Sequence, residues 1–295
     1  MDRFVRWATA QPAIEAAMVV GSRARTDHPA DAWSDLDIVI FATDPEILLE
    51  NDAWLHNIGD PVITFLEATA VGAWRERRVL FDGARDVDFS VVPADLLNEL
   101  NAMHPGDLLH AEVGATIARG YRVLIDRNER LTPILRRITT ITECEPLPPT
   151  YEQFDETIND FWYHCVWIAK KLRRGDLIVA HECLDGHQRR LIMHLIRWHP
   201  ERKGTLWHGA RFMEEWAPQE VTMRLATTWA EHDTESIRCA LTNMMDLVAW
   251  LTKEIANAYS LEETPVAPEV AARRWVTEIS MSPPPGEVHS GPRAG

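Results

Sequence analysis

Long apolar runs and signal-like segments are missing from this sequence. No stretch approaches the ~18 to 20 apolar residues that cross a bilayer, and the start, Met1-Asp2-Arg3-Phe4, lacks the charged-then-apolar pattern of a signal peptide. Cysteine is also scarce: the 295 residues include four, none in a C-x-x-C pair, at Cys144, Cys165, Cys183 and Cys239. We therefore expect buried free thiols in a cytoplasmic protein without membrane contact.

Basic residues are few relative to acidic ones. The chain has 30 lysines and arginines against 45 aspartates and glutamates, which gives a net charge of −15. Such a surface repels nucleic acid phosphates and offers DNA or RNA no broad basic footprint. It attracts small cations, because clefts lined by one sign of charge focus the opposite sign. The alternative is that the acidity serves solubility alone.

Several functional signatures are absent as well. The sequence has no G-x-G-x-x-G, no Walker A and no G-x-S-x-G motif. The segment from His181 to His187 is not H-E-x-x-H, because position 185 is aspartate. On a regular helix, residues at i and i+6 also point to different faces. We therefore expect no zinc site made by His181 and His187.

A Gly-Ser turn followed by paired carboxylates is the most informative motif present. An apolar run ends at Gly21-Ser22, and after a polar loop Asp35 and Asp37 open a second apolar run. Side chains two apart on a strand share a face, and neighbouring carboxylates repel each other unless a cation lies between them. Backbone N–H groups of such a turn can cradle a phosphate. The pattern predicts a Mg²⁺–nucleoside triphosphate site; the alternative is a solvated strand end.

A third carboxylate is required if this interpretation holds. Asp86 and Asp88 both supply one, on the same face of a predicted strand. Asp88 lies within an apolar run that includes Phe89 and Val91, so it is the more sheltered of the two. The residues alone leave either aspartate open as the third member.

The chain divides into two parts of different character at Pro146–Thr150, a stiff proline-rich break. Residues 1–145 predict a mixed α/β (α+β) domain, and residues 150–280 predict an α-helical bundle. The expected strands are 16–20, 37–41, 62–66, 77–81, 87–92 and 120–126, with helices at 3–8 and from residue 93. Helices are expected at 161–174, 177–198, 218–231, 236–259 and 268–279. Residues 281–295, rich in proline, are expected to be disordered.

The order strand, Gly-Ser, loop, strand with D-x-D resembles that of polymerase-β-like nucleotidyltransferases. Within that superfamily the chain resembles the aminoglycoside 6-adenylyltransferases, also called streptomycin adenylyltransferases, over about residues 1–280. Two departures stand out: Arg85 precedes Asp88 one position too early, and the family's paired tryptophans become Trp162-Tyr163. The matching segments are 21–23, 34–39, 82–89, 123–126, 160–163, 168–170, 198, 212–216, 240–247 and 273–276.

The resemblance implies a nucleotidyltransferase fold and an enzyme that confers antibiotic resistance. It would transfer AMP from ATP to a hydroxyl of a streptomycin-like aminoglycoside, with Mg²⁺ as cofactor and pyrophosphate as product. The active site would lie between the two domains. The implied metal ligands are Asp35, Asp37 and Asp88, with Asp88 also the general base; the ATP-binding residues are Gly21, Ser22, Arg23 and Lys170; the acceptor-binding residues are Asp155, Asp160, Trp162 and Tyr163.

Two other interpretations stay open at this point. An enzyme of the same fold can act on a different small hydroxylated molecule, such as a lincosamide or a metabolite. A regulatory nucleotidyltransferase-like antitoxin is a second alternative, of a different class. Such antitoxins are generally shorter and lack a long helical half, and the intact Gly-Ser turn with three carboxylates favours an enzyme.

Overall fold

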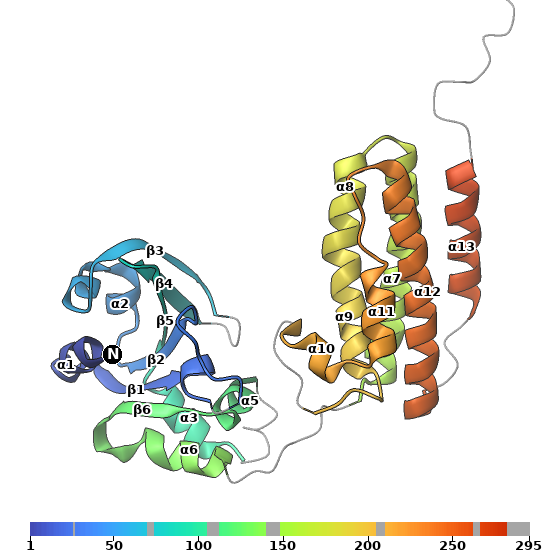
Figure 1. The fold of residues 1–295 in the computed structure, drawn as a ribbon. Coiled ribbons are helices and arrows are strands. Elements are labelled where there is room, and N and C mark those ends of the chain that lie inside the picture. Colours follow the sequence, from blue (N-terminus) through green and yellow to red (C-terminus); the bar gives the residue numbers. More distant parts are fainter. Residues whose placement is uncertain are drawn as a thin grey trace, which may run out of the picture. The chain divides into compact units, whose positions relative to one another are not determined.

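The computed structural model describes residues 1–25, 27–69, 74–104, 112–139, 148–204, 210–261 and 266–281 (Figure 1). The chain forms two compact units, Met1–Cys144 and Glu145–Gly295. The division falls beside the proline-rich break at which the sequence predicts a domain boundary. The predicted disordered tail lies outside the described residues from residue 282 onward.

A six-stranded mixed sheet forms the first unit, in the order β3-β4-β5-β2-β1-β6. Neighbouring strands are antiparallel except for β2 and β5, which pair in parallel at the centre. The strands correspond to the six predicted ones, and the mixed sheet expected from the sequence is confirmed. Their bounds are β1 Ile14–Val20, β2 Leu36–Ala42, β3 Pro61–Ala68, β4 Arg75–Phe81, β5 Arg85–Pro93 and β6 Arg122–Asp126.

Helices cover both faces of this sheet, as Figure 1 shows. On β2, Ile38 and Ile40 pack in one core and Val39 and Phe41 in the other, as strand alternation requires. Asp37 has the same parity as Val39 and therefore projects from the second face. The first core contains α1 Asp2–Thr9 and α2 Glu46–Glu50; the second contains α3 Leu96–Ala102, α5 Glu112–Ala118 and α6 Leu131–Thr139.

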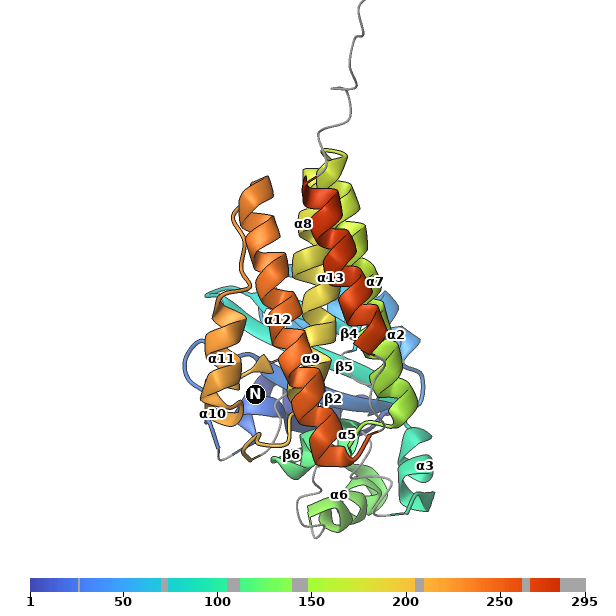
Figure 2. The ribbon, with the colours of Figure 1, turned by 90° about the vertical axis from the view of Figure 1, so that its right-hand side faces the viewer.

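The second unit is helical, which confirms the predicted change of character. In Figure 2, α13 runs along α7, and α12 packs against α7 and α9. The expected helix at 218–231 already ends at Ala226, and the one at 177–198 is interrupted by a π-helix. The bounds are α7 Tyr151–Arg173, α8 Leu177–Glu182, π-helix Cys183–Gln188, α9 Arg189–Trp198, α10 Met213–Trp216, α11 Gln219–Ala226, α12 Thr234–Tyr259 and α13 Val266–Met281.

Helix α7 begins ten residues before its predicted apolar stripe, because a capping box starts it. The Thr150 hydroxyl accepts from the Gln153 amide at 3.2 Å, and the Gln153 side chain accepts from the Thr150 amide at 3.1 Å. The stripe itself, from Phe161 to Leu172, is buried as predicted. The free thiols are not all buried as the sequence predicts: Cys165 is buried, whereas Cys239 is exposed.

No helix in the described ranges combines the length and apolarity that a bilayer span requires.

Asp126 at the end of β6 generates a stability prediction. Its two carboxylate oxygens accept from the Leu131 and Thr132 amides at 2.9 and 2.8 Å, which satisfies two of the backbone N–H groups in the first turn of α6. Asp126→Asn turns one oxygen into an N–H₂ donor that faces an N–H donor. We expect it to lower the free energy of unfolding of the first unit by about 1 to 2 kcal/mol at pH 7, measured by urea denaturation.

The pH dependence of this loss in unfolding free energy provides a second test. Burial by itself raises the pKa of Asp126, but the hydrogen bonds from Thr132 and Leu131 outweigh it and hold the pKa below 3.8. A depressed pKa contributes stability above the unfolded-state value, and this contribution disappears as the pH falls through the folded-state value. The difference between wild type and Asp126→Asn must therefore shrink below about pH 4. Asp44, which is exposed, provides the matched variant: Asp44→Asn should change neither the free energy of unfolding at pH 7 nor its decrease at acid pH.

Candidate functional site

Three carboxylates converge at the centre of the sheet. The parallel register of β2 and β5 sets Asp37 directly opposite Asp88, and Asp35 immediately precedes β2. One oxygen from each of the three lies within 4.8 Å of the others. Asp88 is buried and the other two are half-buried. Asp86 is exposed, pairs with Leu80 on β4 and does not belong to this group.

The Gly-Ser turn lies against this cluster. Gly21 has a φ of +68°, and a Cβ atom at this position would lie 2.1 Å from Asp37 Oδ2. Glycine is therefore required both by the backbone conformation and by the close approach of the carboxylate. The turn and Asp37 are in direct contact, as a shared phosphate and cation site needs.

Two buried oxygens at the site are orphaned within the described part of the chain. Ser22 Oγ and Asp88 Oδ1 are both inaccessible to solvent and have no hydrogen-bond partner there. A buried polar atom without a partner costs about 1 to 3 kcal/mol. An incoming phosphate oxygen suits the Ser22 hydroxyl, which can donate to it, and a cation suits the Asp88 carboxylate. The donor set, three hard carboxylate oxygens, fits Mg²⁺.

Arg23 fastens the loop between the turn and β2. Its guanidinium donates to the backbone carbonyls of Ser34 at 2.6 Å and Asp35 at 3.0 Å. These bonds fix the backbone of Asp35 and hence the start of the acidic strand. The sequence predicts a phosphate contact for Arg23; the structure adds this positioning contact.

Arg78 on β4 is a site residue that sequence reasoning missed. It is the register partner of Asp88, forms an ion pair with that carboxylate, and lies 3.1 Å from Glu67 and 3.5 Å from Glu76. Burial raises the pKa of Asp88 and Arg78 offsets part of that rise. Burial likewise raises the pKa of Glu76, against a 3.1 Å hydrogen bond from Ser90. Only the antiparallel register of β4 and β5 identifies these partners, because nothing in the sequence pairs residue 78 with residue 88.

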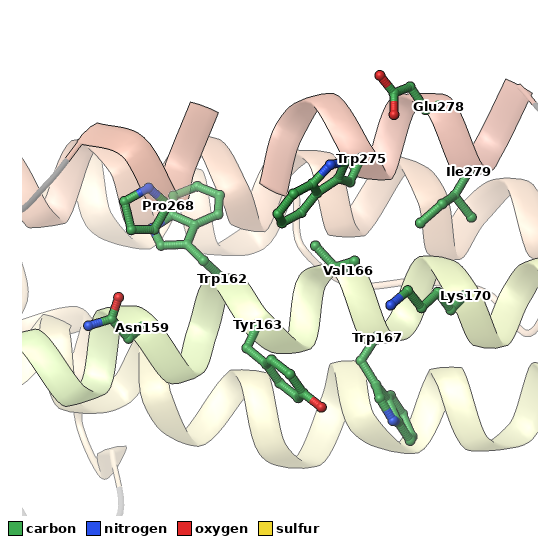
Figure 3. Close-up of a pocket in the computed structure, with 10 residues that line it drawn as sticks. All are labelled: Asn159, Trp162, Tyr163, Val166, Trp167, Lys170, Pro268, Trp275, Glu278 and Ile279. Atoms are coloured by element: carbon green, nitrogen blue, oxygen red, sulfur yellow. The ribbon is translucent and has the colours of Figure 1, made fainter. Parts of the chain in front are cut away.

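The helical unit contains a pocket of about 530 Å³ between α7 and α13 (Figure 3). Three residues with predicted binding roles, Trp162, Tyr163 and Lys170, line it from α7, and Trp275 and Glu278 line it from α13. Trp162 is only 4% exposed, whereas Tyr163 is 66% exposed. Arg273 covers the Trp162 ring at 5.4 Å. Of the two aromatic residues predicted to bind the acceptor, Tyr163 therefore has the ring that is available for stacking on a ligand.

The two predicted acceptor-binding carboxylates do not line this pocket. Asp155 accepts a 2.8 Å hydrogen bond from the Asn159 amide on the same helix. Asp160 contacts His164 on α7 and His187 on the π-helix, through 2.6 and 2.9 Å contacts. Their roles toward an acceptor stay predictions.

Comparison with known proteins gives a family match, sequence relatives and a structural neighbour. The sequence profile of the streptomycin adenylyltransferase family matches residues 1–269. An aminoglycoside 6-adenylyltransferase of Bacillus subtilis (strain 168) is 25% identical over 244 residues, covering 78% of this chain and 79% of the relative. One from Campylobacter jejuni is 24% identical over 237 residues, 77% of each chain. A crystal structure of an aminoglycoside 6-adenyltransferase from Bacillus subtilis aligns with 96% of this chain and 97% of its own, at 18% identity and a TM-score of 0.45.

The contact between Gly21 and Asp37 generates the second prediction. Gly83 also has a positive φ, +78°, but nothing lies within 4 Å of a Cβ placed there. Gly21→Ala and Gly83→Ala should therefore both lose about 1 kcal/mol of stability from backbone strain. Only Gly21→Ala should also push the Asp37 carboxylate aside and weaken Mn²⁺ binding, measured by electron paramagnetic resonance titration. Equal Mn²⁺ affinity in the two variants would contradict the contact.

Proposed function

The chain belongs to the streptomycin adenylyltransferase family, and on that premise we propose that it transfers AMP from ATP to a hydroxyl of a streptomycin-like aminoglycoside. Pyrophosphate is the leaving group, Mg²⁺ is the cofactor, and inactivation of the antibiotic is the consequence. The observation that carries the proposal is the convergence of Asp35, Asp37 and Asp88 beside a Gly-Ser turn with an orphaned, buried hydroxyl.

Asp35, Asp37 and Asp88 are the residues that would hold Mg²⁺. When bound, the ion neutralises charge on the α-phosphate and on the leaving oxygens, which is the main requirement of phosphoryl-type transfer. The orphaned Asp88 Oδ1 supports this assignment because a divalent cation would satisfy it. Three carboxylates within 4.8 Å of one another also need a cation to offset their mutual repulsion.

Gly21, Ser22 and Arg23 orient the triphosphate in this proposal. The Ser22 hydroxyl donates to a phosphate oxygen, and the absence of a side chain at Gly21 lets the phosphates approach the backbone beside Asp37. Arg23 holds the loop and thereby the position of Asp35. Lys170 remains a proposed phosphate ligand from the helical unit.

Asp88 is the proposed general base. The acceptor hydroxyl gives its proton to the Asp88 carboxylate while its oxygen forms a bond to the α-phosphorus and the bond to the pyrophosphate oxygen breaks. Burial raises the pKa of Asp88, which makes the carboxylate a better proton acceptor, and the ion pair with Arg78 keeps it ionised and oriented.

The acceptor is proposed to be cationic. The net charge of −15 favours such a ligand, and Tyr163 offers an exposed ring to a sugar in a pocket that also contains Glu278. Asp155 and Asp160 are proposed as further negative charges for the acceptor, and Trp162 as the base of the pocket.

The decisive experiment is a product assay. The purified chain is incubated with ATP, Mg²⁺ and a panel of aminoglycosides, with a lincosamide as comparison, and products are analysed by mass spectrometry. We expect an added AMP on streptomycin, with pyrophosphate released in equal amount. Modification of the lincosamide alone would favour the alternative acceptor, and no transfer to any acceptor would contradict the proposal.

Loss of one metal ligand should abolish most activity without unfolding the chain. For Asp37→Asn we expect a fall in kcat/KM of about 100-fold or more, because a partner of the cation is removed. Circular dichroism should stay unchanged. Asp86→Asn, two residues before Asp88 and exposed, is the matched control and should retain near wild-type turnover. Full activity of Asp37→Asn at saturating Mg²⁺ would contradict the assigned ligand.

Removal of the base should affect kcat rather than ATP binding. We expect Asp88→Asn to lower kcat by roughly 10²- to 10⁴-fold, with the Kd for ATP, measured by calorimetry, largely retained. If Asp86→Asn lost more activity than Asp88→Asn, Asp86 would be the base.

A further inference from the structure

Outside the acidic cluster, three side chains of the helical unit form a second convergent set of metal-type ligands. Asp160 and His164 are separated by one turn of α7, and His187 comes from the π-helix. Asp160 Oδ1 lies 2.6 Å from His164 Nδ1 and 2.9 Å from His187 Nε2. The imidazole centroids are 4.1 Å apart, and one donor atom from each residue lies within 4.8 Å of the others.

The π-helix is what brings His187 to this position. It inserts an additional residue into the turn, so the residues that follow lie on a different face than a regular helix would give. Gln188 then fixes the register: its buried amide donates to the Phe161 carbonyl at 3.1 Å and contacts Cys165 Sγ at 3.2 Å. His187 is thereby held opposite Asp160 and His164, the residues that adjoin these two anchors.

The half-buried Asp160 carboxylate is paired with imidazoles. Within the described ranges its ion-pair partners are the two imidazoles, and no lysine or arginine pairs with it. Two imidazole nitrogens and a carboxylate oxygen form an N₂O set, the ligand type of open zinc sites with a solvent-facing fourth position. All three side chains are 27 to 37% exposed, so an ion can reach them from solvent.

We propose that Asp160, His164 and His187 bind one zinc-class divalent ion that links α7 to the π-helix. The ion coordinates Asp160 Oδ1, His164 Nδ1 and His187 Nε2, and each imidazole carries its hydrogen on the other ring nitrogen. His164 Nδ1 thereby gives up its 3.0 Å contact with the Asp160 backbone carbonyl. Ligand distances of about 2.0 to 2.2 Å require these atoms to move apart by less than about 1 Å. An ion here would compete with a cationic acceptor for the Asp160 carboxylate, whereas Asp155 would stay available to the acceptor.

Binding of Zn²⁺ alone tests this site, with the full untagged chain freed of metal by a chelator and then kept in excess Mg²⁺. Mg²⁺ prefers oxygen ligands, so it saturates the three-carboxylate cluster and leaves the histidine set to Zn²⁺. Calorimetry should give one saturable Zn²⁺ site per chain. Co²⁺ in place of Zn²⁺ should give a visible absorption band, and Zn²⁺ should raise the Tm of the wild type.

Substitutions of single histidines show whether the bound Zn²⁺ occupies this site or another one. His164→Gln and His187→Gln should each weaken Zn²⁺ binding at least tenfold, since even loss of a residue that only supports a ligand costs about 10- to 100-fold. His194→Gln, an exposed histidine on α9, and Asp37→Asn should leave it unchanged. No saturable Zn²⁺ site in the wild type, or Zn²⁺ binding retained in both glutamine variants, would overturn the proposal. Neither result depends on whether AMP transfer occurs.

Discussion

The parallel pairing of β2 with β5 is the constraint on which the first unit depends. This pair is the sole parallel contact among the described strands, and its register aligns Asp37 with Asp88. A slip by one residue would turn one of the two carboxylates into the apolar core on the other face of the sheet. The apolar residues Ile38, Ile40 and Phe89 prevent that slip, because they must stay buried. The hydrophobic core thus fixes the geometry of a polar site.

Burying Asp88 beside two other carboxylates creates an electrostatic cost, and Arg78 from β4 offsets it. The same guanidinium is close to Glu67 and Glu76, so β3, β4 and β5 each contribute to one charged network. Arg78 offsets only part of the negative charge of the three carboxylates, and the remaining charge can serve an enzyme of this family. It leaves the carboxylates with residual attraction for a cation, whereas full neutralisation by protein would leave none.

In the helical unit, too, apolar packing fixes the positions of polar side chains. Its long apolar helices bury their stripes against one another, and this packing needs only helical periodicity. The π-helix departs from that periodicity at Cys183–Gln188, where it aligns Gln188 with α7 and His187 with Asp160. Departures of this kind are frequent at functional sites, because they cost stability and persist where the local geometry serves a purpose.

The sequence by itself determined the two-part organisation, the six strands, the helical second half and the ordered motifs of an adenylyltransferase. These follow from local periodicity and from residues that lie close together in the chain, such as Asp35 and Asp37. The tertiary structure alone decided what depends on register between distant segments. It selected Asp88 over Asp86, paired Arg78 with Asp88, buried Trp162 beneath Arg273, and brought His187 to Asp160. The periodicity of one segment shows which face of a helix or strand a residue occupies. The residue that it contacts depends on strand pairing and helix packing between segments that lie ten or more residues apart in the sequence.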